Sequence, residues 1–117
     1  MDDSSFNDGH RTRLRQRFRV SGSEALPDYE LLELLLFRSI ARRDVKPLAK
    51  KLITRFGSFA ETLGAPLERL TEVEGVGVTT ALDLKIIAAA GQRMVKGEIG
   101  KRETVSSFAK LIDYCRS

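Results

Sequence analysis

The chain has 117 residues, of which 42% are hydrophobic and 31% charged, and its formal net charge is +4 at pH 7. This size and composition predict one globular domain with a buried core, and the basic balance weakly favours polyanionic partners. The longest unbroken apolar run, Ile86 to Ala90, is far too short to span a membrane, and a single cysteine, Cys115, excludes an internal disulfide. We therefore expect a cytoplasmic protein with no part in a membrane.

The first 19 residues contain a polar start followed by an arginine-rich segment. We expect residues 1–9 to be disordered and residues 10–19 to form a helix, in which Leu14 and Phe18 contact the body of the protein. One side of this helix would carry three arginines, Arg11, Arg15 and Arg19. Guanidinium groups bind phosphates well, but a charged helix face is just as often merely solvent-facing.

Two helix–connector–helix units follow in the chain. In the first, Asp28 to Phe56, a leucine-rich helix begins after Pro27, a basic connector spans residues 38–43, and a second helix ends at Gly57. A short helix capped by Ser58 separates it from the second unit, Pro66 to Met94, whose connector is a glycine hairpin. Since helical periodicity dominates and alternation of β-branched residues is nearly absent, the pattern predicts an all-α fold.

The glycine hairpin is the strongest functional signal. Gly75 and Gly77 can adopt positive φ, and Thr79 is a plausible N-cap of the helix that follows. Amides at this helix start, together with the helix dipole, are suited to a phosphate. The alternative is that the glycines only make a tight turn between two helices. A P-loop and a dinucleotide fingerprint are excluded, because no lysine follows the last glycine and the third glycine is missing.

The charges around the hairpin are mixed. No basic residue follows the second glycine directly, and Glu72 and Glu74 precede the turn. The candidate DNA-binding residues of the chain are Gly75, Val76, Gly77, Val78, Thr79, Thr80, Lys85, Arg11, Arg15, Arg42 and Arg43.

Beyond Met94 the helical pattern breaks. Residues 96–105 are charged, contain two glycines and are typical of a linker, and a last helix is expected over residues 106–117. The predicted organisation is therefore a disordered segment 1–9, a helical domain 10–95, a linker 96–105, and a final helix that begins a further domain lying outside this chain.

Two blocks of the sequence resemble the N-terminal half of the bacterial RadC family of DNA repair proteins. The blocks read LPDYELLELLLFRSIARRDVKPLAKKLITRFGSF and LTEVEGVGVTTALDLKIIAAAGQRM. The resemblance implies a tandem helix-hairpin-helix domain, a compact SAM-like bundle of about five helices plus a C-terminal helix. It also implies a C-terminal JAMM-type metallopeptidase domain, with a zinc site of two histidines and an aspartate, which this chain cannot supply because His10 is its only histidine.

Two hypotheses of function remain. The first is a weak DNA-binding module without sequence specificity, which grips the phosphate backbone through the hairpin. The alternative is a structural or protein-interaction domain that positions the metallopeptidase-like domain and does not bind DNA. We expect no cofactor, no metal and no enzymatic activity in this part of the protein, since the sequence contains neither a Ser/His/Asp set nor a cluster of metal ligands.

Overall fold

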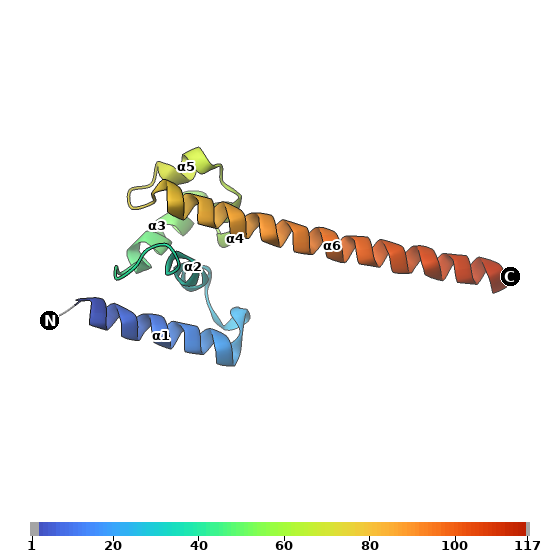
Figure 1. Ribbon diagram of the computed structural model, residues 1–117, viewed down its shortest axis with the longest axis horizontal. Helices are drawn as coiled ribbons and strands as arrows, with labels where there is room; N and C mark the ends of the chain where they lie inside the picture. Colours follow the sequence, from blue (N-terminus) through green and yellow to red (C-terminus); the bar gives the residue numbers. More distant parts are fainter. Residues whose placement is uncertain (1–2, 117) are drawn as a thin grey trace. The chain divides into compact units, whose positions relative to one another are not determined.

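The structure is a computed structural model that describes the backbone of residues 3–116 and, within it, the side chains of residues 9–101, 109 and 110. Its elements are α1 (Asp3–Ser21), the 3-10 helix η1 (Ser23–Ala25), α2 (Asp28–Leu36), α3 (Lys46–Phe56), α4 (Phe59–Gly64), α5 (Leu67–Thr71) and α6 (Val78–Arg116) (Figure 1). The described backbone contains no strand, which confirms the prediction of an all-α fold.

The chain divides into two units, Met1–Lys85 and Ile86–Ser117, and the core lies in the first. In this unit α2 packs on α3, and α4, α5 and the first turns of α6 complete the bundle. Leucines provide most of the largest fully buried side chains, namely Leu14, Leu32, Leu36, Leu52, Leu70 and Leu84. Burial of each such side chain contributes about 1.5–3 kcal/mol relative to exposure.

The helix ends of the first unit follow local sequence signals. Gly57, at φ +109°, ends α3, and the Ser58 hydroxyl accepts a hydrogen bond from the Glu61 amide at 3.1 Å at the start of α4. Pro66 directly precedes α5. At the start of α3 the N-cap residue is Val45, and the Asp44 carboxylate accepts from the Lys46 amide at 3.1 Å. These ends are therefore where the sequence predicts them.

Two predicted segments differ in the structure. Helix α1 begins at Asp3, within the segment 1–9 for which we expected disorder; an acidic residue at a helix N-terminus is favourable. Helix α6 runs through residues 96–105, where we expected a linker. Gly97 and Gly100 cost about 1 kcal/mol each relative to alanine, and the Lys, Arg and Glu residues around them are good helix formers. Whether residues 106–117 begin another domain stays a prediction.

In the described part of the chain, no helix combines the length and the apolarity needed to cross a membrane.

Candidate nucleic-acid interface

The glycine hairpin lies between α5 and α6 and contains one glycine in a left-handed conformation. Gly75 has φ +98°, whereas Gly77 is not at positive φ. Val73 and Val76 are buried on either side of the turn, and the Val76 amide donates to the Val73 carbonyl at 3.0 Å. The turn is thus held to the bundle by its valines, and only Gly75 is required by backbone conformation.

The backbone amides at the start of α6 have no hydrogen-bond partner among the described residues. The first helical hydrogen bond runs from the Ala81 amide to the Gly77 carbonyl at 3.0 Å, so the helix begins at Val78 and Gly77 occupies the cap position expected for Thr79. Gly77, Val78 and Thr79 are exposed and Thr80 is buried. Among the described residues, no acceptor is bonded to the amides of residues 77–80. These donors therefore remain open to an anion.

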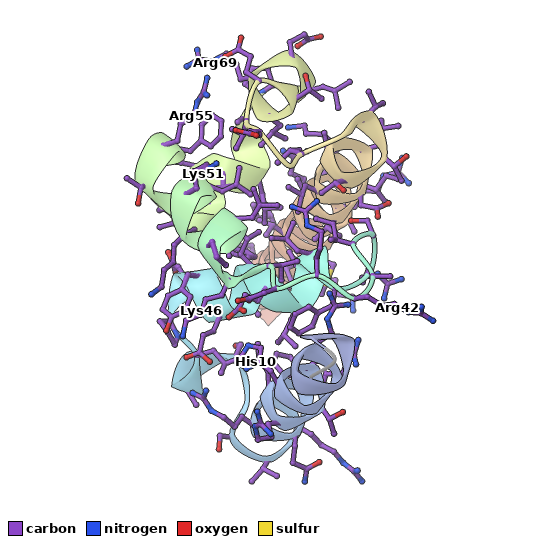
Figure 2. The ribbon with its side chains drawn as sticks, turned by 90° about the vertical axis from the view of Figure 1, so that its left-hand side faces the viewer. His10, Arg42, Lys46, Lys51, Arg55 and Arg69 are labelled. Atoms are coloured by element: carbon purple, nitrogen blue, oxygen red, sulfur yellow. The ribbon has the colours of Figure 1, made fainter. Side chains whose placement is uncertain are left out.

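The two connectors meet at one side of the first unit, as Figures 1 and 2 show. Between them lies a hollow of about 420 Å³, lined by Arg43, Asp44, Pro47, Leu48, Lys51, Glu74 and Gly75. A Cβ atom placed on Gly75 would lie 3.3 Å from the Arg43 guanidinium and 3.4 Å from Leu48. The sequence lacks a cation directly after the hairpin, but the fold brings Arg43 and Lys51 to it from the first connector and α3.

Among the remaining predicted residues, Arg15 and Arg42 are exposed. Arg42 has φ +61° in the first connector, and the Arg15 guanidinium lies 5.5 Å from the centre of the Phe37 ring. Both stay candidates for contacts with phosphate.

Arg11, which we predicted to contact DNA, is instead buried, with only 7% of its surface exposed. Its guanidinium donates to the carbonyls of Ile40 at 2.6 Å, Arg43 at 2.8 Å and Phe37 at 3.4 Å, and it lies 4.5 Å from the Phe37 ring centre. The guanidinium is therefore occupied by carbonyls of the first connector, and a contact of Arg11 with DNA stays a prediction.

Lys85, also predicted to contact DNA, has a comparable structural position. Its ammonium group donates to the carbonyls of Leu63 at 3.1 Å and Ala65 at 2.9 Å, at the C-terminal end of α4. A cation is favourable there because helix carbonyls are left without partners at that end.

Sequence reasoning missed a buried acidic residue, Glu33. This side chain is fully buried in α2, its Oε1 lies 3.1 Å from Nε2 of His10, and its Oε2 has no partner among the described residues. Burial raises the pKa of the Glu33 carboxyl, while the hydrogen bond with His10 acts in the opposite direction. A single glutamate within a run of leucines was the signal that could have identified it.

Sequence reasoning also missed the basic surface of α3. This helix carries no acidic residue and four cations, which are Lys46, Lys50, Lys51 and Arg55. In contrast, the described side chains contain no group of three or more His, Cys, Asp or Glu residues that could hold a metal ion.

Fold and site together define an all-helical domain in which a basic connector and a glycine hairpin face a common hollow. By sequence, the chain belongs to the family described as UPF0758 N-terminal, which matches residues 9–82 and is the RadC family that the two blocks resemble. A UPF0758 protein of Ruegeria pomeroyi is 55% identical over 108 residues, covering 92% of this chain and 48% of the relative. A UPF0758 protein of Rhodobacter capsulatus is 53% identical over 104 residues, covering 89% and 49%.

The chain therefore spans about half the length of these curated relatives. No solved structure matches it significantly.

Proposed function

We propose that this domain is a DNA-binding module without sequence specificity, built as a tandem helix-hairpin-helix. The pairs α2–α3 and α5–α6, each joined by a short connector, would be its two repeats. The observation that carries the proposal is the row of amides at the start of α6, which have no acceptor among the described residues and belong mostly to exposed residues. Contacts from such amides to phosphate oxygens fix the position of a duplex without reading its bases.

The charges near the amides support weak binding. A helix N-terminus contributes about 0.3–1 kcal/mol to binding an anion, and Glu74 in the adjoining hollow opposes it. Arg43 and Lys51 in the same hollow compensate that carboxylate. Because these interactions are exposed, we expect the affinity to depend strongly on salt concentration.

Gly77 offers a clean test of the proposal. A Cβ atom at this position would meet nothing within 4 Å and the residue is not at positive φ, so Gly77→Leu should keep the fold. The leucine side chain would stand in front of the amides and block a phosphate. We expect Gly77→Leu to abolish binding of a fluorescent duplex in an anisotropy titration, while its far-ultraviolet circular dichroism stays unchanged.

The matched control is Gly97→Leu, an exposed glycine with equally open surroundings in the second unit.

For the wild-type chain, log K should fall by about 0.9 per contacted phosphate for each tenfold rise in salt. Unchanged affinity in a folded Gly77→Leu variant would contradict the proposal.

A second candidate function is a structural domain that positions the remainder of a longer protein and binds no DNA. It is favoured by the relatives, which are about twice as long as this chain. Absence of duplex and single-strand binding even at low salt would select it. The expectation that this part of the protein is not an enzyme stays a prediction.

A further inference from the structure

A line of cations leads away from the glycine hairpin across α3 to α5. We call it the basic track, and it consists of Arg43, Lys51, Arg55 and Arg69. Arg43 and Lys51 line the same hollow, and Lys51 and Arg55 are four residues apart on α3, about 6 Å along the helix axis. Figure 2 shows Lys51, Arg55 and Arg69 following one another along the same side of the first unit.

The far end of the basic track is occupied by one carboxylate. Arg55 Nη2 donates to Glu72 Oε2, and Arg69 Nε lies 3.8 Å from that same oxygen. Glu72 is 54% exposed, and both arginine side chains are more than a third exposed. Solvent-exposed ion pairs of this kind contribute about 0–1 kcal/mol, so another anion can readily replace the carboxylate.

We propose that Glu72 competes with the phosphates of bound nucleic acid for Arg55 and Arg69. The backbone held by the α6 amides would continue along the basic track and displace Glu72 from the two guanidiniums. A guanidinium donates to phosphate oxygens as well as to carboxylate oxygens, so a phosphate can take the place of the Glu72 carboxylate. This inference rests on the proposed function and adds to it an autoinhibitory contact and a longer binding surface.

The partner inferred is a nucleic acid rather than an acidic protein, because the basic track is continuous with the hairpin. Its first two cations line the hollow that also contains Gly75, directly before the exposed amides. A polyanion with regularly repeated phosphates can contact the basic track and the α6 amides at once. The phosphates held at the two places then add up in the salt dependence of binding.

The test is Glu72→Gln in the full chain, measured by anisotropy with a fluorescent duplex over a range of salt concentrations. Release of the two guanidiniums should tighten binding several-fold at low salt. The slope of log K against log salt should steepen by about 0.9 for each new phosphate contact. Adding Arg55→Gln and Arg69→Gln to this variant should remove the gain.

The matched control is Glu68→Gln on α5, which changes the net charge by the same amount. Glu68 is exposed and has no ion pair with the described residues. Equal gains in duplex affinity for Glu72→Gln and Glu68→Gln would show that the gain comes from the change in net charge alone, and would overturn the inference.

Failure of the inference can be told apart from failure of the proposed function. Loss of binding in Gly77→Leu with no gain in Glu72→Gln would keep the DNA-binding function and remove the basic track from it. A Glu72→Gln variant that binds poly-glutamate more tightly, but not the duplex, would make the track a docking surface for acidic proteins and overturn the inference. No duplex binding by any variant would overturn both.

Discussion

At Glu33 the chain places a carboxyl group among leucines, and this burial has a consequence for stability. The desolvation of the side chain raises its pKa above the ordinary value of 4.5. The groups that act on it are His10 from α1, Glu30 from its own helix and Lys46 from α3. A raised pKa means that the folded chain holds the Glu33 proton more tightly than the unfolded chain does.

The pH dependence of stability follows from this difference. The stabilisation that comes with the proton is complete below the unfolded pKa and is lost as pH rises through the folded pKa. In Glu33→Gln, which keeps the shape without the charge, this loss is absent. We expect the free energy of unfolding of Glu33→Gln, minus that of wild type, to rise as pH increases above about 4.5. Urea denaturation of both proteins between pH 4 and pH 8 measures this difference in the free energy of unfolding.

His10→Ala provides the companion variant. The hydrogen bond with His10 lowers the pKa of Glu33, so its removal should move the pH-dependent loss of stability to higher pH. Parallel stability curves for wild type and Glu33→Gln across the whole pH range would contradict this account of the buried carboxyl.

The roles of single cations were the part of the site least accessible to sequence reasoning. Arg11, Lys85 and Lys51 carry the same charge in the sequence, yet the first two donate to backbone carbonyls and the third lines the hollow. Arg11 meets carbonyls 26–32 residues away, and Lys85 meets carbonyls 20 and 22 residues away. No local pattern encodes such partners, because they depend on how whole helices pack.

For the elements, the best-predicted features were those with short-range causes. Gly57, Ser58 and Pro66 mark helix ends through their own backbone preferences, and the structure places the ends there. Helix lengths were predicted less well at both ends of the chain. In the part of α6 beyond Met94, Lys, Arg and Glu residues with good helix propensity extend the helix past the apolar pattern that we used to bound it. Residues 3–9 of α1 are mostly poor helix formers, so neither propensity nor the apolar pattern predicts that part of the helix.

Helix α1 is tied to the first connector by Arg11, and this contact should be important for stability. The side chain bonds three carbonyls of the segment from Phe37 to Arg43 and stacks on the Phe37 ring. Arg11→Ala leaves these carbonyls without their partner, and loss of a charged hydrogen-bond donor from a buried site costs about 1.5–3 kcal/mol. We expect a decrease of about this size in the free energy of unfolding, measured by urea denaturation.

Arg13→Ala is the matched control, since Arg13 is an exposed arginine on the same helix. Surface changes of this kind usually alter stability by less than about 0.5 kcal/mol. Similar stability losses for the two variants would show that the hydrogen bonds of Arg11 to the first connector add little to the free energy of unfolding.

On the scale of the whole molecule, the two units differ in what stabilises their helices. In the first unit α2 and α3 bury leucines against each other, whereas every residue from Ala89 to Lys101 in the second unit is exposed. A helix gains most of its stability from packing, and Gly91, Gly97 and Gly100 lower the intrinsic stability of this one. The amides of the second unit should therefore open far more readily than those of the core.

Hydrogen–deuterium exchange followed by mass spectrometry tests this difference directly. Amides of Ala49 to Ile53 in α3 should exchange through global or near-global opening, because Leu48, Ala49 and Leu52 are buried. Amides from Gln92 to Lys101 should exchange at least about 100-fold faster, through local fraying that leaves the first unit folded. Equal protection of both segments would contradict the prediction. If that protection disappeared on dilution, the helix of the second unit would be covered by another copy of the chain.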